Sequence, residues 1–172
     1  MSIKIGILSD SHTRLDYLKL VLKQMQEEGI NYLLHAGDLC KQESLEMISS
    51  LNIPYTCVFG NNDYGLIEFA NVYNIKKEPS YFKIQNSTFK MMHLPFYMTP
   101  DSDVVVYGHT HIFEHNFNGK TLFINPGEVC AREKPRIEFV ILQIDEESYK
   151  LEYNYFTKED LSLHKEEYIY EK

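Results

Sequence analysis

Short apolar runs alternate with helix-like segments in the first part of the chain. Residues 3–8 form a short apolar run with β-branched residues, which predicts a buried strand, and 31–35 and 54–59 are predicted as the second and third strands. Apolar positions recur at helical spacing in 15–25 and 43–51, which predicts two amphipathic helices. Strands that alternate with helices pair in parallel through right-handed crossovers. We therefore expect the loops that follow the three strands to share one edge of a sheet.

After about residue 75 the pattern changes to a series of short strands. We expect these at 81–84, 88–92, 103–107, 112–117, 121–124, 137–144 and 150–156. Asn118-Gly119 separates two of them and predicts a two-residue hairpin, because both residues tolerate positive φ. This half of the chain is therefore predicted to be mostly antiparallel.

Length and composition indicate one globular domain. The chain has 172 residues, of which 44% are hydrophobic and 24% are charged, and this composition argues against disorder. We expect the domain to occupy residues 1–156. The C-terminal segment 157–172 is rich in Glu and Lys, and a helix, an arm packed on a neighbour and a frayed tail are all left open for it.

The chain start and the cysteines predict a cytoplasmic protein without a membrane partner. Residues 1–4 lead directly into an apolar run, without a basic region, a long apolar segment or a cleavage pattern. The three cysteines, Cys40, Cys57 and Cys130, lack CxxC spacing and fit reduced thiols. Whether the protein forms a homo-oligomer stays open.

The net charge bears on the choice of partner. A formal charge of -8 at pH 7 repels polyanions at long range, so long nucleic acid is not expected as a partner. A small phosphorylated substrate remains compatible, since bound divalent cations would make a pocket positive.

Residue types that bind metals follow the predicted strands at five places. These are Asp10-Ser11-His12, Gly37-Asp38, Gly60-Asn61-Asn62-Asp63, His93 and Gly108-His109-Thr110-His111. Asp10 and His12 are two residues apart in extended chain, so both can point to one side and chelate an ion. Each segment alone also fits a turn, a helix cap or a surface histidine. Their joint occurrence at strand ends indicates a site for two divalent metals.

At these residues the chain resembles the calcineurin-like metallophosphoesterase superfamily, whose motifs occur in the order DxH, GD, GN, H and GHxH. The resemblance runs from about residue 3 to residue 128. It includes Asn125-Pro126-Gly127, which is similar to a turn in the small, single-domain bacterial and archaeal phosphodiesterase branch. It implies an α/β fold class with two mixed β-sheets packed as a sandwich and flanked by helices. It also implies a metal-dependent phosphodiesterase that hydrolyses a small phosphodiester with a hydroxide activated by two metals.

The resemblance further implies a role for each site residue. Asp10, His12 and His111 would hold the first metal, Asn61, His93 and His109 the second, and Asp38 would bridge the two. The candidate catalytic residues are Asp38, Asn61, Asp63 and His109, with Asp63 expected to orient a ligand histidine. Mn²⁺ is our first choice of metal because it suits mixed carboxylate, amide and imidazole ligands, although Fe²⁺, Ni²⁺, Co²⁺ and Zn²⁺ also fit.

Two departures from the family pattern bear on the substrate. Asn62 stands where many phosphomonoesterases and protein phosphatases of the superfamily have a histidine that can protonate the leaving group, so we favour diesters over monoesters. The segment 94–100 replaces a longer helical one. Pro95 and Pro100 make a helix improbable there, and we expect a more open rim.

Two alternative functions stay open. The retromer subunit of vesicle sorting has the same fold with altered ligands and serves as a protein-interaction scaffold, whereas the intact ligand types of this chain favour catalysis. A phosphomonoesterase or phosphoprotein phosphatase is disfavoured by Asn62 and by the lack of an inserted recognition domain.

Other reactive side chains are expected to be structural. We expect His35 in the core or behind the ligands, and His115 and His164 on the surface. Cys40 is expected to act as a small hydrophobe. Arg132 could bind substrate phosphate, with a solvated charge as the default expectation.

Overall fold

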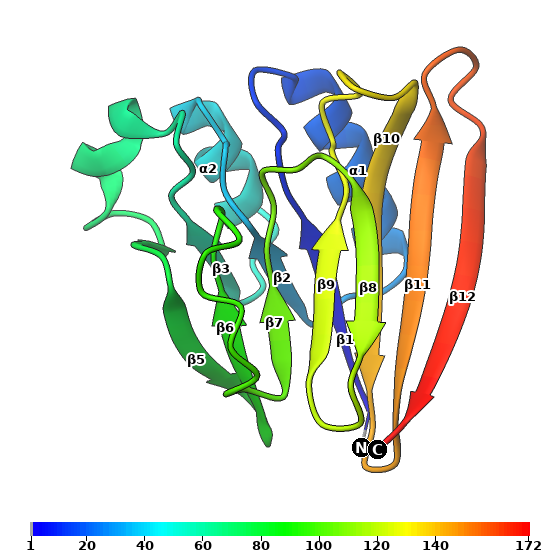
Figure 1. Cartoon of the computed structure of the whole chain (residues 1–172). Coiled ribbons are helices and arrows are strands. Elements are labelled where there is room, and N and C mark those ends of the chain that lie inside the picture. The colour runs from blue at the N-terminus through cyan, green and yellow to red at the C-terminus, as the bar shows by residue number, and fades with distance from the viewer. Residues whose placement is uncertain (1) are drawn as a thin grey trace.

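The computed structural model describes residues 2–172 as a sandwich of two mixed sheets with helices on one side (Figure 1). The first half contains β1 (Ile3–Leu8), α1 (Leu15–Glu27), β2 (Tyr32–His35), α2 (Gln42–Ser49), β3 (Tyr55–Val58), the 3₁₀ helix η1 (Tyr64–Phe69) and β4 (Ile75–Lys76). The second half contains β5 (Ser80–Ile84), β6 (Ser87–Met91), β7 (Val104–Val106), β8 (Phe113–Phe117), β9 (Leu122–Pro126), β10 (Arg136–Ile144), β11 (Ser148–Thr157) and β12 (Leu163–Glu171).

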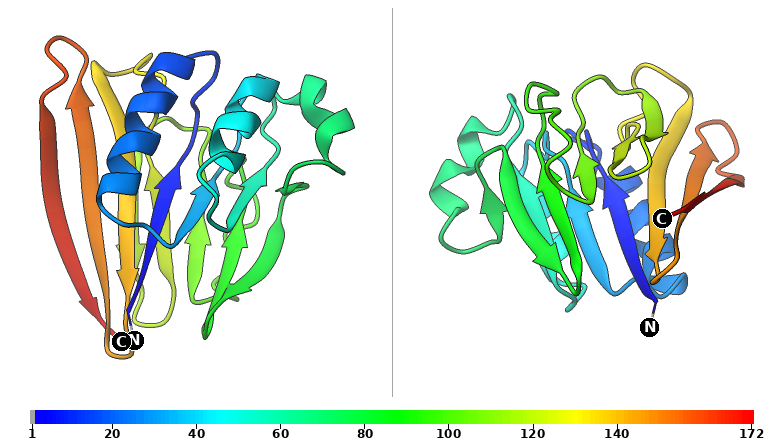
Figure 2. Two further views of the ribbon diagram at one scale, coloured as in Figure 1. Left: turned by 180° about the vertical axis from the view of Figure 1, so that it is seen from behind. Right: turned by 60° about the horizontal axis from the view of Figure 1, so that its bottom comes forward.

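The larger sheet has seven strands in the order β12-β11-β10-β1-β2-β3-β4. The strands β1 to β4 pair in parallel, as the alternation of strands and helices predicts. The strands β10, β11 and β12 extend the sheet with antiparallel pairs. Viewed from behind, α1 and α2 cover the outer face of this sheet (Figure 2).

The smaller sheet has five strands in the order β5-β6-β7-β9-β8. Its outer pairs are antiparallel, and the hairpin predicted at Asn118-Gly119 joins β8 to β9. The expectation of mostly antiparallel pairing is wrong at its centre, where β6, β7 and β9 run parallel. The reason is the connection over 92–103, which is long enough to carry the chain from the end of β6 back to the level where β6 begins, so that β7 runs in the same direction.

Two apolar layers hold the sandwich together. Val140 and Leu142 of β10 belong to the layer between the sheets, whereas Phe139 and Ile141 belong to the layer beneath the helices. This alternation follows from the two-residue period of a strand. In α1 the buried residues recur at helical spacing and face the larger sheet; they are Leu18, Val21, Leu22 and Met25.

The C-terminal segment, whose form the sequence left open, contains the edge strand β12, which pairs with β11 along its length. The expectation that 94–100 forms no helix is confirmed. Within residues 2–172 no helix is both long and apolar enough to cross a bilayer.

Candidate metal centre

The predicted ligands lie in the loops that follow β1, β2, β3, β6 and β7, at one edge of the sandwich. Figure 1 shows β1, β7 and β9 pointing toward this edge, with both chain ends at the opposite edge. Hydrogen bonds between these loops, such as His12 N to Asp38 O at 2.8 Å and His109 N to Asp10 Oδ2 at 3.1 Å, tie them to one another. The topology therefore brings together residues that are distant in sequence.

The backbone at the site is strained. Five predicted ligands have φ between 46° and 69°, in the left-handed region; they are Asp10, His12, Asp38, His109 and His111. Such a conformation costs a non-glycine residue about 1–3 kcal/mol and persists only where the surroundings impose it. The concentration of this strain at the ligands indicates loops that are shaped to aim their side chains.

The first group of ligand atoms surrounds Asp10. Its Oδ1 lies 3.2 Å from His111 Nε2 and 3.8 Å from His12 Nε2, and the same His12 nitrogen lies 3.6 Å from Asp38 Oδ2. Ligand atoms of Asp10, His12 and Asp38 lie within 4.8 Å of one another. This spacing suits atoms that share one cation.

The second group surrounds Asn61. Its Oδ1 lies 3.0 Å from His93 Nε2 and 3.1 Å from His109 Nδ1. The same His93 nitrogen lies 3.4 Å from Asp38 Oδ2. Asp38 Oδ2 therefore lies within 3.6 Å of an imidazole nitrogen in each group.

Two atoms of the first group are buried without a hydrogen-bond partner. They are Asp10 Oδ1 and His12 Nε2. A buried polar atom left unpaired costs about 1–3 kcal/mol, and more when it is charged. A cation held between these two atoms would satisfy both, so the side chains present fit a divalent metal.

The protonation of these side chains also suits metal binding. Burial raises the pKa of Asp38, but hydrogen bonds from His93 and Asn62 outweigh it and hold that pKa well below its usual range. Burial lowers the pKa of His12, and the nearby carboxylates do not fully offset this. The site thus offers an ionised carboxylate and a neutral imidazole.

Glu128 holds His111 from behind. His111 Nδ1 donates to the buried Glu128 Oε2 at 2.5 Å, while Nε2 faces Asp10. Burial raises the pKa of Glu128, but its bonds to His111 and to backbone N–H groups lower the pKa to about 2. Burial lowers the pKa of His111, but its bonds to Asp10, Cys130 and Glu128 raise the pKa to about 11. Glu128 and Asp10 therefore flank the imidazole of His111, one at each ring nitrogen.

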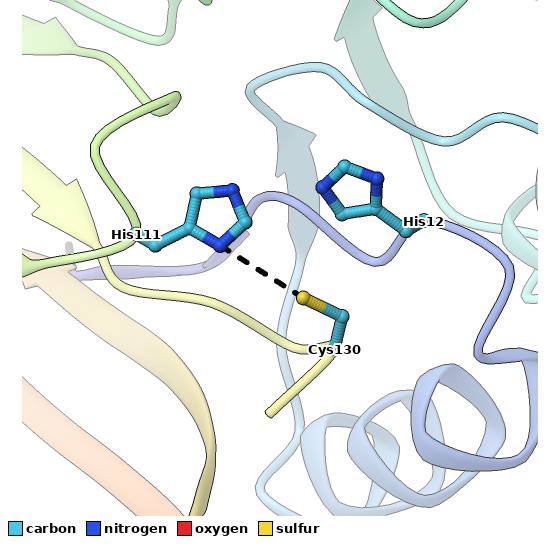
Figure 3. A group of neighbouring side chains, drawn as sticks. All are labelled: His12, His111 and Cys130. Atoms are coloured by element: carbon cyan, nitrogen blue, oxygen red, sulfur yellow. Dashed lines mark hydrogen bonds between the residues drawn. The ribbon is translucent and has the colours of Figure 1, made fainter. Parts of the chain in front are cut away.

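Two further side chains reach His111. Arg132 Nη2 lies 3.0 Å from its Nε2, and Cys130 Sγ lies 3.9 Å from its Nδ1. Figure 3 shows His12, His111 and Cys130 arriving from separate segments, and their ligand atoms lie within 4.8 Å of one another. Burial raises the pKa of the Cys130 thiol, so it is protonated at neutral pH.

Asp63 does not orient a histidine, contrary to expectation. Its carboxylate instead accepts hydrogen bonds from three backbone N–H groups, those of Asp38 at 2.8 Å, Cys40 at 2.7 Å and Gly60 at 2.7 Å. These bonds join the loop after β2 to the loop after β3. Asp63 thus fixes the backbone that carries the two central ligands, Asp38 and Asn61.

Two motif glycines leave room for ligands. A Cβ on Gly60 would lie 2.2 Å from Asp38 Oδ1, and a Cβ on Gly37 would lie 2.6 Å from His93 Nδ1. Gly37 also has φ of +96°, which side chains rarely adopt. The glycines of the GD and GN motifs are therefore required by the close approach of the ligands.

Of the remaining expectations from the sequence, some are confirmed and others are wrong. His35 is buried against Ser11 Oγ at 2.9 Å, and His164 is exposed, as expected. The expectation that His115 lies on the surface is wrong, because His115 is half-buried against Tyr168, with ring centroids 4.1 Å apart. Arg132 contacts the site instead of being only solvated. The role of Glu128 was missed; its one signal is an acidic residue directly after the Asn125-Pro126-Gly127 turn.

Comparison with known proteins shows the family of the chain. A family model for the calcineurin-like phosphoesterase superfamily domain matches residues 3–147. Phosphodiesterase MJ0936 of Methanocaldococcus jannaschii is 29% identical over 143 residues, covering 74% of this chain and 85% of the relative.

Solved structures share the fold. Vps29 of Chaetomium thermophilum superposes with a TM-score of 0.80 at 16% identity and covers 99% of each chain. An archaeal phosphodiesterase superposes with a TM-score of 0.72 at 23% identity, covering 96% of this chain and all of its own. The predicted fold class is confirmed, and the matches support a phosphoesterase, hence a hydrolase. The order of motifs, the sandwich fold and the family match agree that the chain belongs to the calcineurin-like phosphoesterase superfamily.

Proposed function

We propose that the protein is a metal-dependent phosphodiesterase that acts on small diesters. The observation that carries this proposal is the convergence of seven side chains into two groups that share Asp38 Oδ2. In the proposed assignment, Asp10, His12 and His111 hold one cation, Asn61, His93 and His109 hold the other, and Asp38 bridges them. Mn²⁺ suits this ligand set best, while Fe²⁺, Ni²⁺, Co²⁺ and Zn²⁺ are the alternatives.

When bound, the two cations supply an activated water molecule and stabilise the charge that develops on the phosphoryl oxygens. The protein contributes position and charge. Asp10 and Asp38 bring buried negative charge to the centre. Asp63 holds the loop that carries Asp38, and Glu128 holds the imidazole of His111. Hydrogen bonds between the loops hold the strained ligand backbones in this arrangement before substrate arrives.

The identity of residue 62 supports a diester substrate. The Asn62 amide donates to Asp38 Oδ2 at 2.8 Å, and its backbone N–H donates to Asp38 Oδ1 at 2.9 Å. An amide cannot serve as a general acid, and the loss of such an acid typically costs about 10²–10⁴-fold in rate. The site is therefore suited to leaving groups that depart without a proton from residue 62.

A protein-interaction scaffold is the second candidate, because the chain superposes on Vps29 over nearly its full length. The two candidates differ in chemistry at the site. A scaffold has no need of buried, unpaired ligand atoms such as Asp10 Oδ1 and His12 Nε2, whereas a metal-dependent hydrolase does.

The test compares bis-p-nitrophenyl phosphate with p-nitrophenyl phosphate, using metal-stripped protein with and without added Mn²⁺. We expect Mn²⁺-dependent turnover of the diester and weak turnover of the monoester. Asp38→Asn should abolish turnover, whereas Asp145→Asn, in the β10–β11 turn at the opposite edge, should not change it. Turnover of neither ester with any of the five metals would favour the scaffold, and faster turnover of the monoester would favour a phosphomonoesterase.

A further inference from the structure

A cavity adjoins the proposed metal centre. It has a volume of about 640 Å³ and lies between η1, β4 and Leu94. Asn61 lines this cavity, and the Oδ1 of the same residue lies at the centre of the second ligand group. A volume of this size accommodates a drug-sized molecule or one large arm of a substrate. The cavity therefore opens directly beside the place where a phosphoryl group would be held.

The walls of the cavity are mainly apolar and include aromatic rings. Phe59, Ala70, Ile75 and Leu94 line it together with Tyr64 and Ile67. Tyr64 is 79% exposed and Ile67 is 59% exposed, so two large side chains of η1 face solvent at its rim. Exposed apolar side chains grouped around a cavity are typical of a binding site rather than of ordinary surface.

Two lysine side chains contribute the cations of the cavity. Lys76 and Lys77 are exposed, and their side-chain ammonium groups have no ion-pair or hydrogen-bond partner among residues 2–172. The two carboxylates of the cavity accept hydrogen bonds from backbone N–H groups instead of pairing with these lysines. Glu78 Oε2 accepts from His93 N at 2.6 Å and Leu94 N at 2.8 Å, and Asp63 accepts from three N–H groups. In a chain of net charge -8, two unpaired lysines beside an apolar cavity favour an anionic ligand.

We propose that this cavity is a subsite for an aromatic arm of the substrate that carries a further negative charge. The ring packs against Tyr64, Ile67 and Leu94, and the charge pairs with Lys76 and Lys77. The substrate class that follows is a small diester with one aromatic, additionally anionic arm. The placement of this arm next to the scissile phosphate rests on the proposed function, but the binding of a ring with an anion does not.

Binding to metal-stripped protein tests the subsite without requiring turnover. The probe is adenosine 5′-monophosphate, which joins an aromatic ring to a phosphate, and calorimetric titration compares it with adenosine and with ribose 5-phosphate. We expect the probe to bind at least about tenfold more tightly than either fragment, since each fragment loses one set of contacts. Equal affinity for ribose 5-phosphate would overturn the aromatic part of the proposal, and equal affinity for adenosine would overturn the anionic part.

Matched variants locate the binding. Ile67→Glu and the double variant Lys76→Ala/Lys77→Ala should each weaken probe binding by at least about tenfold. Ile169→Glu, at an isoleucine of β12 that is 61% exposed, and Lys83→Ala/Lys120→Ala, at two exposed lysines elsewhere, should leave it unchanged. Unchanged affinity in the cavity variants would overturn the subsite.

The same variants separate this inference from the proposed function. If wild-type protein hydrolyses bis-p-nitrophenyl phosphate but does not bind the probe, the subsite is wrong and the phosphodiesterase proposal stands. If the probe binds at the cavity but no ester is hydrolysed, the subsite stands and the phosphodiesterase proposal is wrong. In active protein, Ile67→Glu should raise KM for the diester more than it lowers kcat, because the cavity contributes binding rather than chemistry.

Discussion

The contact between His111 and Glu128 illustrates how single residues prepare the centre. His111 donates from Nδ1 to Glu128 Oε2 at 2.5 Å, which leaves Nε2 directed at Asp10. Glu128 Oε1 meanwhile accepts from the backbone of Glu133 and Lys134 at 2.7 and 2.9 Å. A carboxylate behind a ligand histidine fixes both its orientation and its tautomer. Glu128 is therefore a positioning residue that also anchors the loop leading to β10.

We predict that Glu128→Gln weakens metal binding about 10–100-fold, because a neutral amide orients His111 less firmly than a carboxylate. Calorimetric titration of Mn²⁺ into metal-stripped protein measures this change. Glu159→Gln, in the exposed turn between β11 and β12, is the control and should bind as wild type. An unchanged affinity in Glu128→Gln would show that His111 does not need this support.

Gly60 offers a steric test of the same centre. We predict that Gly60→Ala lowers the free energy of unfolding by about 1–3 kcal/mol and reduces the number of bound metals, because its Cβ would lie 2.2 Å from Asp38 Oδ1. Gly65→Ala is the matched control, since nothing lies within 4 Å of a Cβ there. Thermal melts and metal analysis of both variants measure the effect. Full metal content in Gly60→Ala would contradict the close packing of the two loops.

At the level of elements, the connection over 92–103 shapes the smaller sheet. Lys90 of β6 is fully buried, and its Nζ reaches Asp101 Oδ1 and Thr99 O, each at 2.6 Å. These bonds hold the segment against the outer face of the sheet, where Met98 packs on a small apolar cluster. Lys90 therefore fixes the chain that follows the ligand His93.

We predict that Lys90→Met releases this segment while the rest of the fold persists. Methionine keeps the apolar stem but loses the bonds to Asp101 and Thr99, and Asp101 remains partly exposed to water. Limited chymotrypsin digestion should then cut faster at Phe96 and Tyr97, which are 74% and 45% exposed. Lys83→Met on neighbouring β5 should leave the cleavage rate unchanged, and equal rates in both variants would refute the role of Lys90.

Local periodicity explains which elements could be predicted from sequence. The strands β1 to β3 and both helices have clear apolar patterns, and so the parallel edge and its ligand loops follow. The direction of β7 could not be predicted, because 92–103 has no helical pattern to mark a crossover. The strand β12 was missed because residues 164–167 are polar and exposed at the sheet edge, so no apolar alternation marks them.

Motif order likewise explains how much of the site could be predicted. All seven candidate ligands follow strand ends, so the sequence could locate them. The contacts of Glu128 and Arg132 with His111 arise only when β9 and β10 bring their connection back to the loop after β7. The cavity beside Asn61 could not be predicted either, since its walls come from segments without a shared motif.

At the scale of the whole molecule, buried tyrosines make the free energy of unfolding depend on pH in the alkaline range. Burial and the charge of Asp103 raise the pKa of Tyr149 to about 12, above the value of about 10 expected in the unfolded chain. The unfolded state therefore loses this proton first. The contribution of Tyr149 is complete below pH 10 and is lost as the pH rises toward 12.

We predict that Tyr149→Phe makes the free energy of unfolding less sensitive to pH between 10 and 12, by up to about 1.4 kcal/mol per pH unit. Urea unfolding at several pH values measures the slope. Tyr64→Phe, at a tyrosine that is 79% exposed, should keep the wild-type slope. The same slope in Tyr149→Phe and wild type would contradict the burial of this phenol.

In the proposed function, the fold brings two candidate ligand groups together at one centre, where they share Asp38. Titration of Mn²⁺ into metal-stripped protein, followed by electron paramagnetic resonance, tests this claim most directly. The account predicts two ions per chain with coupled spins, at most one uncoupled ion in Asp38→Asn, and two coupled ions in Asp145→Asn. A single ion in the wild type, or a coupled pair that survives Asp38→Asn, would contradict the bridged centre.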